Sequence, residues 1–360
     1  MSIPTAGLAM DEQCSALIRR VNQLYHEFTQ TSFDGDHSRR FALESPFWQQ
    51  VARRTLSGRR RPGPAQGVTR TADTRGLVVV DLACGTGFVT HTLSCWLTAR
   101  DRLVAMDLGE APLHTTAQKW DRRHSANFDG PQLERVAADA GLLPLADRSV
   151  DLLAMNAALH HVPSPRAVLC EIDRVLRPGG FFALGFEPNR THFASAVMTH
   201  LSCGLTRMIW YASPRQNVRR LRDWRAGRAR FHNARYSDRQ IPDAGPLTED
   251  VLATAINERL LADGLIAESL PAARLLDLVD PHARGRADGV GLDPTALIRE
   301  AMPDYRPHLL ISSDYLGETI RRWPMVRSLV DATLRTVAPR HGSLFSWLLA
   351  KPDAPSEVSA

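Results

Sequence analysis

The stretch LVVVDLACGTGFVT at residues 77–90 decides the fold. An apolar run leads to Asp81, Gly85 and Gly87 follow it, and an apolar helix start comes directly after them. A continuous apolar run of this kind is typical of a parallel strand that is buried on both faces. A helix that begins at a Gly-rich turn presents free backbone N–H groups to a ligand. The stretch therefore predicts an α/β domain with a ligand site at the carboxyl end of its first strand.

The position of a third glycine distinguishes two kinds of cofactor site. The dinucleotide pattern G-x-G-x-x-G uses three glycines to bring the backbone close to a pyrophosphate. In this chain Thr90 stands at the third position, and its β-branched side chain would crowd a pyrophosphate. S-adenosylmethionine (SAM) has no phosphate, and Asp81 can face its ammonium group. The turn favours SAM over a dinucleotide.

Acidic residues end the next two predicted strands. Residues 102–106 lead to Asp107, which lies about 20 residues beyond the turn, where an acid can accept both ribose hydroxyls of either cofactor. Residues 135–138 lead to Asp139 and Ala140, an acid and a small residue that suit an adenine amino group. Further strands are predicted at residues 149–156 and 181–186, with a helix at 165–176 and a turn at 177–180 between them.

Five segments together resemble the class I SAM-dependent methyltransferases, most closely the methyltransferase type 11 group that includes ubiquinone and menaquinone methyltransferases. The segments are DLACGTG (81–87), AMDLGEA (105–111), AADAGLLPLADRSVDLL (137–153), NAALHHV (156–162) and EIDRVLRPGGFFAL (171–184). The resemblance implies a Rossmann-like seven-stranded α/β sheet in the order 3-2-1-4-5-7-6, with helices on both faces and SAM as the cofactor. The cofactor-binding residues that we expect from the motifs are Asp81, Ala83, Cys84, Gly85, Gly87, Asp107, Leu108, Asp139, Ala140 and Asn156.

Catalytic candidates are expected at the carboxyl ends of the fourth and fifth strands, where open α/β sheets bind ligands. Because the methyl group of SAM is bound to a positive sulfur, much of the catalysis is positioning, and a hydroxyl acceptor also benefits from a base. We select His160, His161 and Glu187. For His161 local packing is an alternative, and Glu187 could orient a substrate or pair with an arginine. His26, His37 and His192 are further acid–base options, and no spacing predicts a metal site.

These observations predict a methyltransferase that acts on a small organic acceptor, most simply at oxygen, in a biosynthetic pathway. One alternative is a quinone or lipid methyltransferase at a membrane surface, because an apolar helix expected at residues 193–211 precedes an Arg-rich segment. Another is an accessory protein that binds SAM without turnover. The Arg-rich segment has few aromatic neighbours, which disfavours a nucleic-acid partner.

Composition favours a cytoplasmic enzyme. The chain has 360 residues, a net charge of +5 and five cysteines. An odd cysteine number without metal-ligand spacing indicates reduced thiols. No secretory leader or membrane-spanning run is evident in the sequence.

The predicted organisation has seven parts. An N-terminal segment at 1–56 contains two helices, and its Tyr25 or Phe33 could contact the ligand by analogy with the resembled group. A sixth strand is expected at 264–270, a last strand at 343–350, and helices at 247–263, 294–302, 314–323 and 325–337. The remaining parts are a flexible Arg/Pro/Gly linker (57–75), the SAM-binding core (76–189), a helical Arg-rich cap insertion (190–246), a continuation of the core (247–270), a second helical cap insertion (271–342), and the last strand and tail (343–360).

Overall fold

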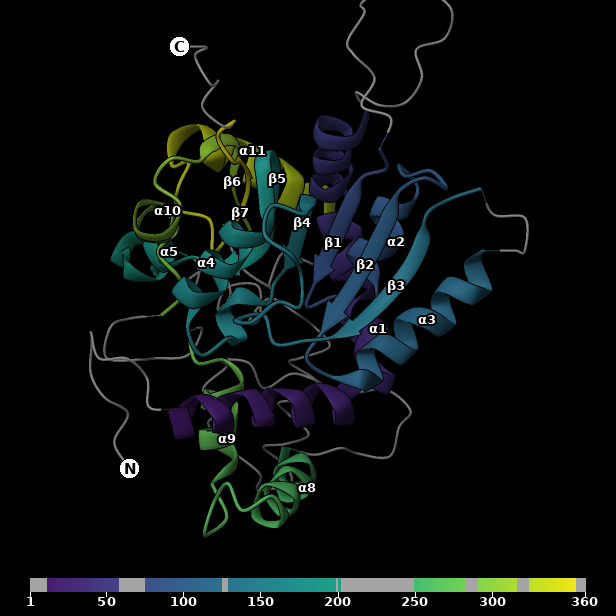
Figure 1. Ribbon diagram of the computed structural model, residues 1–360. Coiled ribbons are helices and arrows are strands. Elements are labelled where there is room, and N and C mark those ends of the chain that lie inside the picture. Colours follow the sequence, from purple (N-terminus) through teal and green to yellow (C-terminus); the bar gives the residue numbers. More distant parts are fainter. Residues whose placement is uncertain are drawn as a thin grey trace, which may run out of the picture.

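The computed structural model describes residues 12–57, 75–124, 129–198, 200–201, 249–282, 290–315 and 324–353. These residues contain a seven-stranded sheet in the order β3-β2-β1-β4-β5-β7-β6 (Figure 1). The first five strands are parallel, and β7 runs antiparallel to β5 and β6. The predicted fold class and strand order are therefore confirmed.

The strands in the core follow the predicted positions with small shifts at their ends. β5 is longer than expected because the turn at residues 177–180 is part of it. The strands are β1 (Val78–Leu82), β2 (Arg102–Asp107), β3 (Gln132–Ala137), β4 (Val150–Asn156), β5 (Leu176–Pro188), β6 (Arg306–Ser313) and β7 (Leu344–Ala350). The helices are α1 (Glu12–Leu56), α2 (Phe88–Ser94), α3 (Glu110–Arg123), α4 (Pro165–Val175), α5 (Arg190–Ala194), α8 (Glu249–Ala262), α9 (Ala272–Val279), α10 (Pro294–Ala301) and α11 (Pro324–Val337), with a 3-10 turn, η2, at Leu159–His161.

Helices cover both faces of the sheet. On one face, α4 and α10 pack on β4, β5 and β7 around residues such as Ile172, Phe182 and Trp347. On the other face, α2 and the C-terminal half of α1 pack through Trp48 and Leu93. Each buried apolar side chain of this size contributes about 1.5–3 kcal/mol. Strands buried on both sides explain why the sequence reads as continuous apolar runs rather than as alternating ones.

The N-terminal segment is one continuous helix, α1, rather than the two expected helices. Its first half packs with α8 and α9 through Ile18, Val21 and Leu24, and its second half packs on the sheet. Once both ends are anchored, propagating a helix adds one hydrogen bond per residue, whereas starting a new one requires a costly nucleus. The helix therefore continues across the middle of the segment and through Pro46. Figure 1 shows α1 running from beside α9 toward the sheet.

The sixth strand is not where the sequence predicted it. Residues 264–270 form a connection between α8 and α9, and their apolar side chains, including Leu265 and Ile266, pack into the cluster with α1. The sixth strand is β6, which pairs only with β7 at the edge of the sheet. Half of β6 is exposed, and Pro307 is tolerated because an edge strand has a free side. These features weakened its strand signal. Consequently α8 covers α1 instead of leading into the sheet.

Several predicted segments lie outside the described residues. They are the linker at 58–74, most of the expected helix at 193–211, the Arg-rich segment to residue 248, and residues 316–323 of another expected helix. The side chains of Phe33 and His37 also lie outside the description. Within the described part of the chain, every helix is too short or too polar to cross a bilayer.

Candidate functional site

The Gly-rich turn after β1 has the backbone geometry that a ligand cradle needs. Gly85 and Gly87 have φ angles of +53° and +86°, values that glycine adopts without strain. A Cβ added to Gly85 would meet no atom within 4 Å, whereas one added to Gly87 would lie 2.9 Å from Thr116 Cγ2. Gly85 therefore borders open space, and Gly87 allows α3 to approach closely. Ala83 also has a positive φ, and the Cys84 backbone nitrogen donates to Met106 at 2.9 Å.

Asp81 is buried beneath this turn. Its Oδ2 accepts a hydrogen bond from the Thr90 hydroxyl at 2.5 Å. Its Oδ1 is also buried and has no hydrogen-bond partner among the described residues. Burial raises the pKa of Asp81 to about 7, although the Thr90 hydrogen bond acts in the opposite direction. A cationic donor that reached Oδ1 would satisfy the atom and favour the ionised carboxylate.

Asp107 joins the end of β2 to the glycine turn. Its Oδ2 accepts from the Gly85 nitrogen at 2.9 Å, and its Oδ1 accepts from the Gly109 nitrogen at 3.1 Å. Burial raises the pKa of Asp107 and also that of the neighbouring Cys84 thiol. Each carboxylate oxygen keeps a further acceptor position. The cysteine remains a neutral, small side chain that fills the turn.

Asp139 contacts α1. Its Oδ2 forms an ion pair with Arg19 Nε at 2.6 Å, and its Oδ1 accepts from the Gly141 nitrogen at 2.9 Å. Ala140, the next residue, is half-buried. A hollow beside this loop is lined by Gln23 and Glu27 of α1, by Leu108 and the start of α3, and by part of β3. The first half of α1 therefore lies against the ends of β2 and β3.

Asn156, at the end of β4, is held by the second half of α1. Its Oδ1 accepts from Trp48 Nε1 at 3.0 Å, and its Nδ2 donates to Glu44 Oε2 at 2.9 Å. Tyr25 packs beside the cluster that α1 forms with α8 and α9. These contacts place Asn156 in the link between the sheet and α1, and they do not place Tyr25 in the glycine turn.

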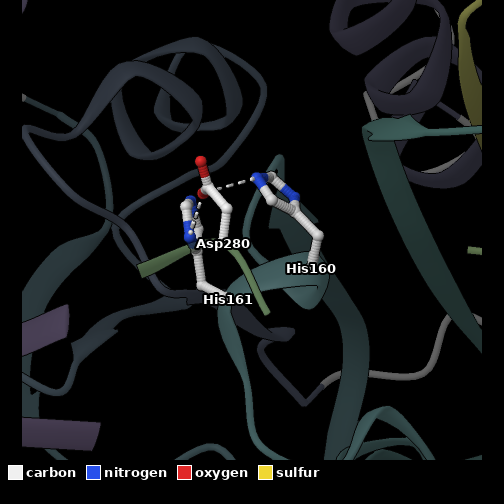
Figure 2. A group of neighbouring side chains, drawn as sticks. All are labelled: His160, His161 and Asp280. Carbon is white, nitrogen blue, oxygen red and sulfur yellow. Dashed lines mark ion pairs between the residues drawn. The ribbon is translucent and has the colours of Figure 1, made fainter. Parts of the chain in front are cut away.

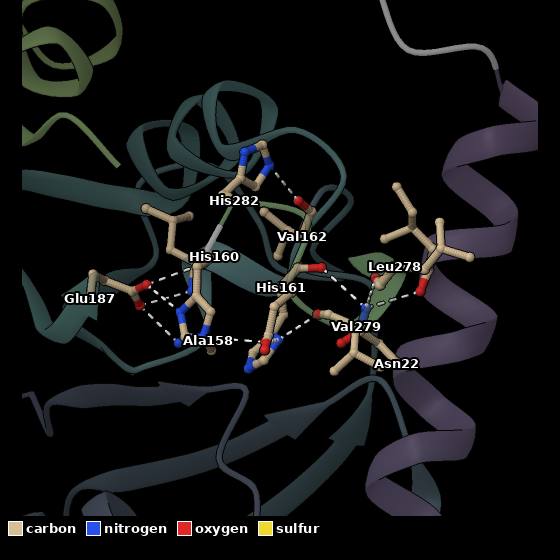
Figure 3. Close-up of polar contacts among 12 residues, drawn as sticks. Asn22, Ala158, His160, His161, Val162, Glu187, Leu278, Val279 and His282 are labelled. Carbon is tan, nitrogen blue, oxygen red and sulfur yellow. Dashed lines mark hydrogen bonds and ion pairs between the residues drawn. The ribbon is translucent and has the colours of Figure 1, made fainter. Parts of the chain in front are cut away.

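Glu187, at the end of β5, is fully buried and accepts four hydrogen bonds. Its Oε1 accepts from the backbone nitrogens of Ala158 and Leu159 at 2.8 and 2.9 Å. Its Oε2 lies 3.0 Å from the His160 nitrogen and 2.7 Å from His160 Nδ1 (Figure 3). Burial alone raises the pKa of this carboxyl, but His160 and the backbone donors lower it overall. Glu187 thus shapes the η2 turn and orients His160, and it makes no approach to open space.

His160 and His161 meet a third polar residue, Asp280, that follows α9. Asp280 Oδ1 lies 3.0 Å from His161 Nδ1 and 3.8 Å from His160 Nε2 (Figure 2). His161 Nδ1 also lies 2.7 Å from the Val279 carbonyl oxygen. The two imidazole rings are 4.0 Å apart between centroids.

The two histidines have opposite pKa shifts. Burial, together with the nearby charge of His161, lowers the pKa of His160 despite the attraction of Glu187. Burial also acts to lower the pKa of His161, but Asp280 and the Val279 carbonyl more than compensate, and the pKa is raised overall. His160 is therefore the neutral ring of the pair near pH 7, with its Nε2 available as an acceptor.

The remaining histidine candidates are separated by the structure. The His26 ring on α1 lies edge-on to His161, with centroids 5.3 Å apart. His192 is buried after β5, and its Nδ1 lies 2.8 Å from the His341 carbonyl oxygen. Only His26 adjoins the histidine pair.

Comparison with known proteins agrees with this geometry. Residues 80–184 match a family model described as a methyltransferase domain. The chain is 32% identical over 116 residues to demethylmenaquinone methyltransferase of Lactococcus lactis, covering 32% of this chain and 44% of that protein. It is 35% identical over 104 residues to malonyl-(acyl-carrier protein) O-methyltransferase of Marinomonas, covering 29% of this chain and 36% of that protein.

The core of this chain is a class I SAM-dependent methyltransferase domain. The chain spans less than half the length of the curated relatives that it matches. A solved SAM-dependent methyltransferase from Aquifex aeolicus aligns with 32% of this chain and 58% of its own at 24% identity, with a TM-score of 0.28, a likeness too slight to add to the assignment.

The methyltransferase domain fits SAM at three points of its own structure. The open space above Gly85 leaves room for a ligand against the backbone. The unpartnered Asp81 Oδ1 suits an ammonium donor, and the oxygens of Asp107 at the adjoining strand end suit ribose hydroxyls. Asp139 could accept from adenine only alongside or in place of Arg19.

Sequence reasoning missed Asp280 and Arg19. Asp280 comes from the segment between α9 and α10, which carries no motif, and only the tertiary packing of α9 on α1 brings it to the histidines. Arg19 lies on a helix whose periodicity reports its buried face, whereas Arg19 itself is half-exposed. Neither residue left a signal in its local sequence.

Proposed function

We propose that the protein transfers a methyl group from SAM to a hydroxyl group of a small organic acceptor, as an O-methyltransferase of a biosynthetic pathway. The observation that carries the proposal is the orientation of His160. Glu187 holds the ring through Nδ1 at 2.7 Å, and η2 sets it beside the carboxyl ends of β4 and β5, the edge at which open α/β sheets bind their ligands.

His160 is the residue proposed to accept the acceptor proton. A neutral hydroxyl is a poor nucleophile, and its proton must leave as the new bond forms. Because Glu187 is ionised and accepts from Nδ1, the proton of the neutral His160 ring lies on Nδ1 and the lone pair lies on Nε2. Glu187 acts here as a positioning residue.

When bound, SAM supplies an electrophilic methyl group on a positively charged sulfur. The residues of the chain have two further tasks in this proposal. Gly85 and Asp107 position the cofactor, and α1 excludes water from the site. Positioning and exclusion of water account for much of the rate in such a displacement.

The names of the relatives also support the proposal. One relative is an O-methyltransferase of malonyl-(acyl-carrier protein), and others are named for quinone acceptors. The acceptor pocket of this chain is formed by segments that these relatives do not match, because the matches cover about a third of the chain. The acceptor is therefore argued from His160 and not from the relatives.

A panel experiment tests the acceptor atom. The purified protein is incubated with methyl-labelled SAM and a panel of phenols, amines and enolic carbon acids, and with a cell extract searched by mass spectrometry for products about 14 Da heavier. Labelling of hydroxyl groups, lost in His160→Gln and kept in the exposed control His200→Asn, supports the proposal. Labelling only at carbon or nitrogen contradicts it, and SAM binding without any product supports an accessory role instead.

A second candidate is methylation of a quinone or lipid at a membrane surface. Phe193, Val197 and Leu201 are 38%, 76% and 48% exposed and recur every four residues, a spacing that forms an apolar stripe on a helix. Such a stripe can lie in a lipid headgroup region. Co-sedimentation with anionic and neutral vesicles at low salt tests this candidate. Val197→Ser should weaken binding and Val251→Ser on α8 should not; no binding to either vesicle removes it.

A further inference from the structure

We propose that His160, His161 and Asp280 form a binding site for one divalent transition-metal ion of the zinc and cobalt class. One ligand atom from each of the three residues lies within 4.8 Å of the other two (Figure 2). The proposal rests on this geometry alone. It goes beyond methyl transfer, because an ion bound to His160 Nε2 would compete with the proton that this atom is proposed to accept.

The first argument is the orientation of His160. Histidine ligands of metal ions usually donate their other ring N–H to a carboxylate, which fixes the tautomer and makes the ligating nitrogen more basic. Glu187 has this role toward His160 Nδ1 at 2.7 Å (Figure 3). The Nε2 lone pair is thereby directed toward Asp280 Oδ1 at 3.8 Å. Two acceptors that face each other are stabilised by a positive species between them.

The second argument is the spacing of the ligand atoms. With zinc-to-ligand bonds of about 2.0–2.1 Å, two ligands of a tetrahedral ion lie about 3.3–3.4 Å apart. The distances from Asp280 Oδ1 to the two histidines are 3.0 and 3.8 Å, on either side of this value. Binding needs only a shift of a few tenths of an ångström. His161 would move its proton from Nδ1 to Nε2, so that the ion replaces a proton now shared with Asp280 and Val279.

The third argument is the kind of ligand and its accessibility. Two imidazoles and one carboxylate favour zinc, cobalt or nickel over magnesium or calcium, which prefer oxygen ligands. Asp280 keeps 29% of its side chain exposed, which gives an ion a way in. Because Asp280 follows α9 and the histidines follow β4, a bound ion would connect the two parts of the chain.

Metal binding is measured on untagged protein that has been dialysed against a chelator. Titration with cobalt(II) should give visible absorption bands of a tetrahedral site, and titration with zinc(II) should raise the melting temperature, both at one ion per chain. Asp280→Asn should weaken zinc binding at least about ten-fold, and Glu187→Gln by about 10–100-fold through His160. The exposed Asp304→Asn is the matched control and should bind as the wild type does.

Two results would overturn the metal site. One is the absence of stoichiometric zinc or cobalt binding by the wild type at micromolar concentration. The other is unchanged binding in Asp280→Asn when circular dichroism shows that this variant is folded. The titrations require no methyl acceptor, so they remain decisive if the proposed methyl transfer is wrong, and methyl transfer by metal-free protein remains testable if the site is wrong.

Discussion

Glu187 Oε2 lies 2.7 Å from the ring nitrogen Nδ1 of His160 and 3.0 Å from the backbone nitrogen of the same residue. One buried carboxylate oxygen thus fixes both the position and the rotation of the histidine. The arrangement joins the ends of β4 and β5, which the chain forms from two separate motifs. It makes His160 a rigid group in a part of the molecule where a reacting proton must be placed accurately.

Replacement of Glu187 by glutamine should lower the turnover rate. The amide keeps the volume but offers one acceptor oxygen in place of two, so the four donors compete and the His160 ring loses its fixed tautomer. We expect kcat to fall about 10–100-fold, by analogy with other second-contact carboxylates, and the KM for SAM to change little. Steady-state kinetics measures both.

The control for this variant is Glu258→Gln on the exposed face of α8, which should behave as the wild type. The unfolding free energy of Glu187→Gln should also fall by about 1–3 kcal/mol because buried donors lose a partner. An increase in the KM for SAM with unchanged kcat would contradict the positioning role.

The pH dependence of the rate should reflect His160. Its pKa is lowered from the usual value of about 6.5, and the neutral ring is the active form. The rate should therefore rise with pH only below pH 6.5 and be flat near neutrality. His160→Gln should lower kcat about 10²–10⁴-fold and remove this rise. A rise centred well above pH 6.5, or one that persists in His160→Gln, would assign the base to another residue.

Cofactor binding should be coupled to proton release from Asp81. Burial raises the pKa of this carboxyl to about 7, and a cationic ligand favours its ionised form. Below pH 7 the protonated carboxyl must lose its proton on binding, so affinity should increase as pH rises from about 5 to 7.5. Calorimetry of S-adenosylhomocysteine binding in buffers of different ionisation enthalpy measures the released proton.

Asp81→Asn should abolish this dependence, and Asp304→Asn should preserve it. Without ligand the sign for stability is opposite to that of a salt-bridged acid. The pKa of Asp81 is about 7 when folded and near 3.8 when unfolded, so its contribution to stability is present at low pH and is lost as the pH rises between these two values. An affinity that is independent of pH would show that the ligand does not reach Asp81.

The two glycines of the turn should respond differently to alanine. Both have positive φ, and alanine there costs about 1–2 kcal/mol. Gly87→Ala adds a contact of 2.9 Å with Thr116 Cγ2 and should cost more stability than Gly85→Ala. The Gly85 methyl group would enter open space and should weaken cofactor binding at least about ten-fold. Melting temperature and calorimetric affinity separate the two effects, and equal losses of stability would contradict this packing.

Much of the core could be predicted from sequence because its signals are local. The strands that carry Asp81 and Asp107 are short apolar runs that end in acids, and the turn between Gly85 and Gly87 needs glycine for steric reasons. The strand order came from the resemblance, and the sheet confirms it. The edge strand β6 was misplaced because its exposed half lacks apolar alternation.

The histidine site was predictable only in part. His160, His161 and Glu187 could be chosen as candidates because they follow β4 and β5. That Glu187 serves His160 rather than a substrate depends on the register of β5 against β4 and on the η2 turn. Asp280 depends on the packing of α9, and the continuity of α1 depends on contacts at its two ends. Such long-range contacts leave no mark on local periodicity.

Calorimetric titration with S-adenosylhomocysteine tests most directly the claim that the strand ends around Gly85 form one SAM pocket. We predict one binding site per chain, competition by SAM, and a loss of affinity in Gly85→Ala but not in Asp304→Asn. Absence of binding by a folded protein, together with saturable binding of a nicotinamide dinucleotide, would contradict the account.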